Sequence, residues 1–230
     1  MGSGRSGRLF KNLPEGPAMT YPSIQCLTID HSQLSHGEQI AALCAAGAEW
    51  IQLRMKGASD AEVTAVAEAA LPVCRAHQCR LIINDKIDVA LAVGADGVHL
   101  GKDDLPWVAA RERAGTRLLI GGTVNSAADA QAAVDCGCLD YVGVGPFRFT
   151  QTKQKLAPVL SPAQWREILD LLAPLPAFAI GGITAADVPD RLPRGLAGIA
   201  VSGTLYQDGD ITANYQALLK AYAVPTTQAP

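Results

Sequence analysis

Two carboxylates of this sequence, Asp85 and Asp104, follow short apolar runs in the segments LIIND and VHLGKDD. Two unpaired carboxylates at one edge of a sheet would raise the pKa of one of them, whereas a divalent ion between them removes this conflict. Magnesium takes one or two protein carboxylates and completes its coordination with water and phosphate oxygens. The pair therefore predicts a Mg²⁺ site. A helix cap is the alternative for each residue, and for the neighbouring Asp103 the cap is the favoured interpretation.

Three polar side chains, Gln52, Arg54 and Lys56, alternate with apolar residues in the segment QLRMK. Alternation along a strand places all three on the same face. Two adjacent cations in a low-dielectric site repel each other unless an anion lies between them, so the segment predicts an anion site. Lys153, in TQTK, adds a third cation, and a metal-bound diphosphate would suit the whole set. The alternative is a pair of surface charges, or a salt bridge to a neighbouring loop.

Two glycine-containing turns, Gly181-Gly182 and Ser202-Gly203, predict a phosphate site. Glycine lets backbone amides approach an anion closely, and a short helix that starts there adds a favourable dipole. The alternative is that tight turns need the glycines for conformation alone. His99 lies inside an expected strand, where a packed or hydrogen-bonded histidine is favoured over a catalytic base.

These residues need a scaffold that brings strand ends together, and the sequence alternates β-branched runs with alanine-rich amphipathic ones. The pattern predicts strands over residues 23–29, 50–55, 80–84, 97–100, 117–121, 141–145, 177–181 and 198–202. It predicts helices over residues 37–46, 60–76, 86–93, 105–113, 127–136, 162–172, 185–192 and 211–223. Strict alternation implies parallel strands with crossover helices, and no glycine-rich turn follows the first strand as in doubly wound sheets. The expected fold is a single (β/α)₈ TIM barrel, whose strands end at one catalytic rim.

Length and composition suit one barrel domain: the chain has 230 residues, of which 49% are hydrophobic. We expect a flexible tail over residues 1–20 and the barrel over residues 21–230. No run is long enough to span a bilayer, and a net charge of −3 without a basic block gives no attraction to nucleic acid.

The six cysteines are scattered along the chain and are expected to be small buried hydrophobes in a reducing compartment. Together with the lack of a signal peptide, this predicts a cytoplasmic protein. The closest pair, Cys136 and Cys138, has no second pair or histidine cluster beside it, so no zinc site is expected there.

Five segments of the chain resemble the thiamine-phosphate synthase family: QLRMK, LIINDKIDVALAVGADGVHLGKDDLP, IGGTVNS, YVGVGPFRFTQTK and AIGGIT. They occur in the family's order and extend over most of the chain, from Gln52 to Ser202. The combination of ND…ADGVHLG-x-x-D with G-P-x-x-x-T-x-T-K is specific to that family. The resemblance implies a TIM-barrel transferase that joins a pyrimidine diphosphate to a thiazole phosphate with Mg²⁺ as cofactor.

The resemblance also implies a role for each matching residue. Mg²⁺ would be bound by Asp85 and Asp104. The diphosphate of 4-amino-5-hydroxymethyl-2-methylpyrimidine diphosphate would be held by Arg54, Lys56, Asn84, Thr123 and Lys153, of which Arg54, Lys56 and Lys153 would be catalytic. Gln52 would face the pyrimidine. The thiazole phosphate would be bound by Thr150, Thr152, Gly182 and Ser202, with Val201 as a further substrate contact.

The chain departs from the family pattern at a few positions. Lys102 stands where glutamine is common and would add a cation near the metal site. Thr123 replaces a usual serine and keeps the hydroxyl group. Arg148 and Phe149 are unusual before the Thr-x-Thr-Lys segment, and the conformation there is left open.

Three rival functions share parts of this pattern. A thiazole tautomerase of the same family needs no Mg²⁺–diphosphate apparatus, and a non-catalytic sensor of thiamine precursors needs no complete set of charged residues. A generic phospho-sugar barrel enzyme has no use for the diphosphate cluster. The expected partners are small-molecule substrates, with no nucleic acid and no membrane, and a homodimer is among the alternatives for the oligomeric state.

Overall fold

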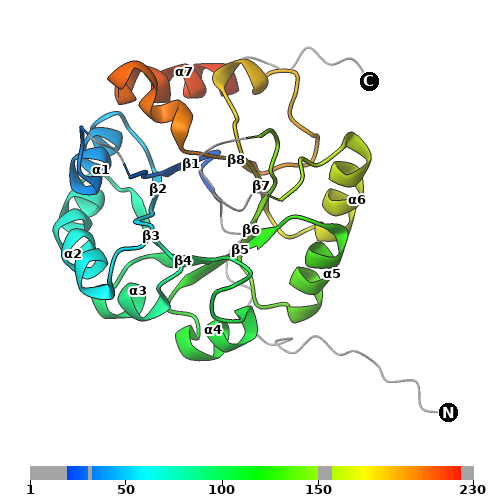
Figure 1. Cartoon of the computed structure of the whole chain (residues 1–230), viewed down its shortest axis with the longest axis horizontal. Helices are drawn as coiled ribbons and strands as arrows, with labels where there is room; N and C mark the ends of the chain where they lie inside the picture. Colours follow the sequence, from blue (N-terminus) through cyan, green and yellow to red (C-terminus); the bar gives the residue numbers. More distant parts are fainter. Residues whose placement is uncertain (1–19, 31–32, 150–156, 224–230) are drawn as a thin grey trace.

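The computed structural model describes residues 20–30, 33–149 and 157–223, and these form a closed barrel of parallel strands in sequential order (Figure 1). The strands are β1 (Ile24–Leu27), β2 (Trp50–Leu53), β3 (Arg80–Asn84), β4 (Gly97–Leu100), β5 (Leu119–Val124), β6 (Tyr141–Val144), β7 (Ala177–Ile180) and β8 (Gly198–Val201). Pairing of β1 with β8 closes the barrel. The expected (β/α)₈ TIM barrel is therefore confirmed.

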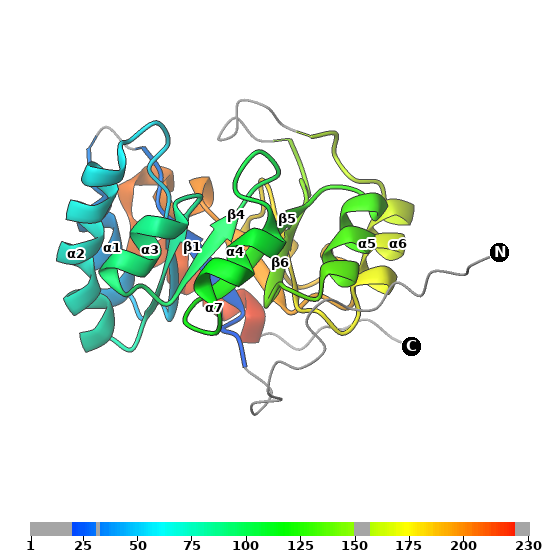
Figure 2. The same ribbon diagram turned by 90° about the horizontal axis from the view of Figure 1, so that it is seen from below.

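Helices surround the strands on the outside of the barrel. They are α1 (His36–Ala45), α2 (Asp60–Ala76), α3 (Ile87–Val93), α4 (Trp107–Ala114), α5 (Ala127–Cys136), α6 (Pro162–Leu172) and α7 (Ile211–Ala223), with the 3₁₀ helices η1 (Ala185–Asp187) and η2 (Gly203–Gly209). Figure 2 shows α1, α2 and α3 on one side of the barrel and α5 and α6 on the opposite side. Serine capping boxes start α1, α2 and α6 and satisfy backbone amides that would otherwise lack partners.

Strand alternation divides the core into two layers. Residues such as Ile51, Leu81 and Val98 face outward and pack under the helices. Trp50, Tyr141 and Phe178 face inward and pack against each other, with ring centroids 4.8–6.0 Å apart. All three lie at or near the first residue of their strands, so this aromatic cluster fills the end of the barrel opposite the catalytic rim.

Strand β5 differs from the expected range 117–121, because it runs from Leu119 to Val124. The two glycines inside it suggest a turn, but they belong to the strand because large neighbours leave no room for a side chain. A Cβ at Gly121 would lie 2.2 Å from the Tyr141 ring, and one at Gly122 would lie 2.7 Å from Leu139 Cδ1. Thr123 is therefore part of β5 rather than of the loop after it.

The helix expected over residues 185–192 is wrong, since only the short η1 forms there. Pro189 lacks a backbone N–H, so it cannot donate the hydrogen bond that would continue the helix beyond its first turn. Pro193 follows four residues later. A short turn thus replaces a full crossover helix between β7 and β8.

Cys136 and Cys138 form a disulfide, which contradicts the expectation of six reduced thiols, whereas Cys26, Cys44, Cys74 and Cys79 are free and buried. The expected tail over residues 1–20 lies outside the described residues except for Thr20. In the part of the chain that the structure describes, none of the helices combines the length and the apolar character needed to cross a membrane.

Candidate active site

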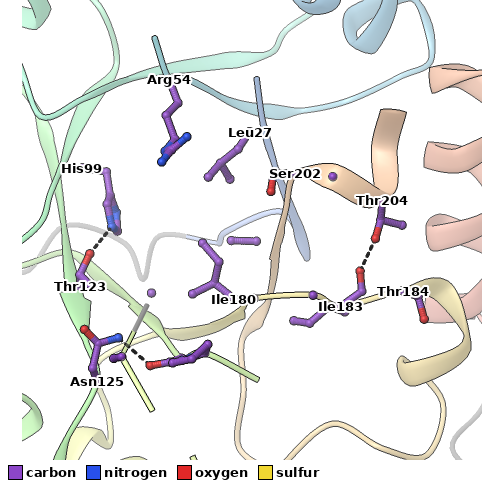
Figure 3. Close-up of a pocket in the computed structure, with 18 of the residues that line it drawn as sticks. Leu27, Arg54, His99, Thr123, Asn125, Ile180, Ile183, Thr184, Ser202 and Thr204 are labelled. Atoms are coloured by element: carbon purple, nitrogen blue, oxygen red, sulfur yellow. Dashed lines mark hydrogen bonds between the residues drawn. The ribbon is translucent and has the colours of Figure 1, made fainter. Parts of the chain in front are cut away.

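A pocket opens at the rim where the strands end, and Figure 3 shows Arg54, His99 and Thr123 on one side of it and Ser202, Thr204 and Thr184 on the other. Apolar side chains, among them Leu27 and Ile180, form part of its wall. Residues from strands far apart in the sequence meet here because every strand of a parallel barrel ends at the same face. Polar groups placed in a partly apolar wall are typical of a small-molecule site.

An acidic pair lies beside this pocket. The carboxyl groups of Asp85 and Asp104 interact directly with each other, and Lys56 Nζ donates to Asp85 Oδ2 at 2.9 Å. Asp104 Oδ2 also accepts from the Gly101 amide at 2.6 Å. Burial, followed by the hydrogen bond with Asp85, raises the pKa of Asp104. Burial acts in the same direction on Asp85, but hydrogen bonds with Asp104 and Lys56 outweigh it and hold the pKa of Asp85 below its usual value.

The chemistry of this pair fits a divalent cation. Two carboxylates that interact directly repel each other when both are ionised, and a cation between them would remove this conflict. The helix-cap alternative for Asp85 does not hold, because Lys86 occupies the N-cap position of α3 and no side chain caps that helix. Among the residues that the structure describes at this rim, Asp85 and Asp104 are thus the ones that could hold Mg²⁺.

Arg54 connects the acidic pair to the pocket. Its side chain lines the pocket, while its backbone N–H donates to Thr28 Oγ1 at 2.9 Å. His36 Nδ1 is hydrogen-bonded to the same hydroxyl at 2.8 Å, and its Nε2 lies 3.1 Å from Asp30 Oδ1. Burial lowers the pKa of Arg54, and the charges of Asp85 and Asp30 oppose this shift. A guanidinium remains charged under such conditions, so Arg54 brings a fixed cation to the boundary of the two parts of the site.

The glycine turn after β7 forms the other end of the pocket. Gly181 and Gly182 have φ angles of 107° and 66°, a region that other residues seldom adopt. Below the turn, the fully buried Asp187 accepts from the Thr184 amide at 2.9 Å and from Arg148 Nη2 at 2.6 Å. Arg148 Nη1 also donates to the Gly182 carbonyl oxygen at 3.3 Å. The unusual Arg148 therefore joins the loop after β6 to the glycine turn.

A chain of hydrogen bonds runs through the barrel beneath the pocket. Gln52 Nε2 donates to Gln25 Oε1 at 3.2 Å, and Gln25 Nε2 donates to the Tyr141 hydroxyl at 3.2 Å. His99 Nδ1 lies 3.3 Å from the same hydroxyl, and His99 Nε2 lies 3.1 Å from Thr123 Oγ1. These contacts fix the orientation of His99 and Thr123 at the floor of the pocket.

The structure brings together many of the residues expected from the sequence. The pocket is lined by Arg54, Thr123, Gly182 and Ser202. The acidic pair and Lys56 lie next to Arg54, and Asn84 is the last residue of β3, directly before Asp85. Thr150, Thr152 and Lys153 lie outside the described residues.

Three residues are placed differently from their expected roles. Gln52 is 2% exposed and is not among the residues that line this pocket, and its contact with a pyrimidine stays a prediction. The Val201 side chain belongs to the hydrophobic core, because alternation along β8 directs its neighbours Ala200 and Ser202 to the pocket. Lys102 forms an ion pair with Asp129 at 2.6 Å rather than with the acidic pair.

Other pocket residues were given no binding role by the sequence analysis. His99 lines the pocket as well as being hydrogen-bonded, and alternation with the outward Val98 and Leu100 could have indicated its inward position. Asn125 Nδ2 donates to the Gly145 carbonyl oxygen at 2.6 Å, and Thr204 Oγ1 donates to that of Ile183 at 2.6 Å. Each of these bonds joins neighbouring loops, a contact that local sequence does not reveal.

Comparisons with known proteins agree with this geometry. The family model for thiamine monophosphate synthase matches residues 26–205. The thiamine-phosphate synthase of Bacteroides fragilis is 42% identical over 192 residues, which cover 82% of this chain and 94% of the relative. That of Methanospirillum hungatei is 44% identical over 167 residues, covering 73% of this chain and 80% of the relative.

Solved structures give the same result. The thiamine phosphate pyrophosphorylase of Pyrococcus furiosus has a TM-score of 0.77 and 30% sequence identity, and the match covers 87% of this chain and 95% of that chain. A 3-hexulose-6-phosphate synthase shares the fold, with a TM-score of 0.65 at 21% identity over 88% of this chain and 100% of that chain. The barrel, its rim and its relatives lead to one conclusion: the chain belongs to the thiamine monophosphate synthase family.

Proposed function

We propose that this chain is a thiamine-phosphate synthase, a transferase. It would join 4-amino-5-hydroxymethyl-2-methylpyrimidine diphosphate to 4-methyl-5-(2-phosphooxyethyl)thiazole and release diphosphate. One observation carries the proposal. The acidic pair, joined by Lys56, lies at the end of the pocket where Arg54 is, and the glycine turn lies at the other end. The synthase relatives, 40–44% identical, support the same activity.

We propose Mg²⁺ as the cofactor, held by Asp85 and Asp104. When bound, such an ion neutralises charge on diphosphate oxygens and makes diphosphate a better leaving group. The direct interaction of these two carboxyl groups supports this assignment, because a cation between them would offset their repulsion.

The side chains of the chain supply the remaining requirements of the reaction. Arg54 and Lys56 bind the diphosphate as the carbon–oxygen bond breaks and the bonding pair leaves with the oxygen. The nitrogen lone pair of the thiazole then forms the new carbon–nitrogen bond to the pyrimidine cation. Amides of the Gly181-Gly182 turn, with Ser202, would hold the thiazole phosphate at the distance needed for this attack. Leu27 and Ile180 reduce the access of water, which would otherwise capture the cation.

One assay tests the proposal and its closest rival. Purified full-length chain is mixed with both substrates and Mg²⁺, and thiamine phosphate is measured with and without EDTA. We expect product that is lost on chelation and restored by added Mg²⁺. Absence of product, with isomerisation of a thiazole phosphate carboxylate by the same preparation, would establish the tautomerase instead.

A cytoplasmic location stays a prediction: the four free buried thiols suit a reducing compartment, whereas the Cys136–Cys138 disulfide does not. A homodimer also stays a prediction, and sedimentation equilibrium of the purified chain would test it.

A further inference from the structure

Three cysteines that are distant in the sequence meet in the helical layer of the barrel. Cys44 lies in α1, Cys74 in α2, and Cys79 directly before β3. Their Sγ atoms all lie within 4.8 Å of one another. The three residues are 1%, 0% and 5% exposed, and all are free thiols. We call them the thiol cluster. The reaction proposed above does not use it.

The backbone at the end of α2 holds two of these thiols together. Gln78 has a φ of 56°, Cys79 N–H donates to the Cys74 carbonyl oxygen at 2.8 Å, and Gln78 N–H donates to that of Arg75 at 3.2 Å. This is the Schellman pattern, in which the side chain after the left-handed residue contacts the side chain five positions earlier. Cys74 and Cys79 are those two residues, so the helix end itself places their side chains in contact.

The end of α1 has the same arrangement and supplies the third thiol. Gly47 has a φ of 91°, its N–H donates to the Cys44 carbonyl oxygen at 3.0 Å, and Ala48 N–H donates to that of Leu43 at 2.9 Å. Because α1 packs against α2, this fixed helix end directs Cys44 toward the other two thiols. Two rigid helix ends therefore define the cluster before any ligand binds.

The thiols also interact chemically. Hydrogen bonds with Cys74 and then Cys79 lower the pKa of Cys44, against the opposing effect of burial. The same contacts raise the pKa of Cys79.

We propose that Cys44, Cys74 and Cys79 form a buried three-thiolate site for a soft, thiophilic metal ion, with Cu(I) as its best representative. Among first-row metals, thiolate ligands favour Cu(I), zinc and iron–sulfur clusters. A planar arrangement with metal–sulfur bonds of about 2.3 Å places the sulfurs about 4 Å apart, and separations within 4.8 Å need only a small contraction. Structural zinc takes four ligands, whereas the cluster found among the described residues offers three.

The position of the cluster determines what bound metal would change. Cys79 lies directly before the first residue of β3. Asn84, the last residue of that strand, and Asp85 after it lie at the opposite end. The thiol cluster therefore lies toward the face of the barrel that contributes to stability rather than catalysis. Each thiol that becomes a ligand releases one proton, and binding to the folded chain raises its stability. We expect Cu(I) to raise the unfolding temperature and to leave turnover unchanged.

The test uses the full chain with Cys136→Ser and Cys138→Ser, because a reduced Cys136–Cys138 pair would itself bind Cu(I). Cu(I) is titrated without oxygen against a chromophoric Cu(I) chelator, and stoichiometry and unfolding temperature are measured. Cys44→Ala, Cys74→Ala and Cys79→Ala are the test variants. Cys26→Ala is the matched control, since Cys26 is also a buried free thiol but lies outside the cluster. Circular dichroism and thiamine phosphate synthesis confirm that each variant folds.

We expect one Cu(I) per chain in the background protein and in Cys26→Ala, with the bound ion lost in each of the three test variants. X-ray absorption of the loaded background protein should show three sulfur neighbours, a readout that needs no further substitution. The proposal is overturned if the background protein takes up no stoichiometric Cu(I), if Cys79→Ala retains it, or if fewer than three sulfurs surround the ion.

Discussion

Asp85 adopts a backbone conformation that most residues avoid, with a φ of 65°. For a residue other than glycine, this left-handed region costs about 1–2 kcal/mol, although aspartate tolerates it better than most. Such strain persists where the surrounding structure requires a specific side chain, often in an active site. At Asp85 the conformation directs the carboxyl group to both Lys56 and Asp104.

Glycine at this position should separate stability from activity. We expect Asp85→Gly to leave stability unchanged or to raise it by up to about 1 kcal/mol, because glycine adopts positive φ without strain. Activity should fall by a factor on the order of 10² because the carboxylate is lost. Urea denaturation and steady-state kinetics measure the two effects.

Gln78→Gly is the control, since Gln78 has a φ of 56° and is far from the rim. This variant should keep full activity. Full activity of Asp85→Gly would remove Asp85 from the site.

The two adjacent aspartates after β4 should differ sharply in their effect. We expect Asp104→Asn to lower kcat/KM by at least about tenfold and to require more Mg²⁺ for half-maximal rate, because an amide is a weaker ligand than a carboxylate. Asp103→Asn changes the same charge on an exposed neighbour and should behave as the wild type. Titration of the rate against Mg²⁺ checks both. Equal Mg²⁺ requirements in the two variants would contradict the role of Asp104.

Asp187 should make stability depend on pH in the acid range. Burial acts to raise its pKa, but hydrogen bonds from Thr184 and Arg148 outweigh it and hold the pKa below its usual value. A depressed folded-state pKa contributes stability above the unfolded pKa of about 4, and this stability is lost as the pH falls through the folded value. We expect Asp187→Asn to lose about 2 kcal/mol at pH 7 and to show a weaker decline toward pH 3 than the wild type. Urea unfolding at a series of pH values measures this dependence of stability on pH.

Asp170→Asn, an exposed change on α6, is the control and should leave the wild-type profile intact. A profile for Asp187→Asn that parallels the wild type would be contrary to this assignment.

At the level of elements, the turn after β7 carries the expected phosphate contact. A Cβ on Gly182 would lie 3.1 Å from Arg148 Cγ and 3.2 Å from the Phe149 carbonyl oxygen, in addition to the strain of a positive φ. We expect Gly182→Ala to cost about 1 kcal/mol of stability and to raise KM for the thiazole phosphate about tenfold.

Gly94→Ala is the matched control for this turn. Gly94 has a φ of 69°, close to the 66° of Gly182, but the nearest atom to an added Cβ lies 3.9 Å away. The control should show the same loss of stability with an unchanged KM. An unchanged KM in Gly182→Ala as well would separate the turn from substrate binding.

Helices whose apolar residues repeat at helical spacing along their whole length could be predicted from the sequence. Elements shaped by distant contacts could not. The range of α2 is the expected 60–76, and α5, α6 and α7 also begin and end as expected. The end of strand β5 was placed too early because Gly122 is dictated by Leu139, seventeen positions away. The segment after β7 was misassigned although Pro189 was visible, since its amphipathic pattern outweighed that local signal.

At the level of the whole molecule, barrel topology explains which parts of the site the sequence could predict. Strand-end residues such as Asp85 and Asp104 could be paired because adjacent strands end side by side. The bond of Arg148 to Asp187 and the thiol cluster join segments thirty or more positions apart, so they depend on how loops and helices pack. The outward direction of the Val201 side chain also had to be taken from the structure.

The central claim is that the rim binds diphosphate through a metal held by the acidic pair. Isothermal titration calorimetry of the purified chain with inorganic diphosphate, in Mg²⁺ and in EDTA, tests it most directly. We expect binding in Mg²⁺ and a loss of affinity of at least about tenfold, or about 1.4 kcal/mol, in EDTA. The same loss should appear in Asp104→Asn with Mg²⁺ present but not in Asp103→Asn. Equal affinity for diphosphate in both buffers would contradict the metal-assisted site.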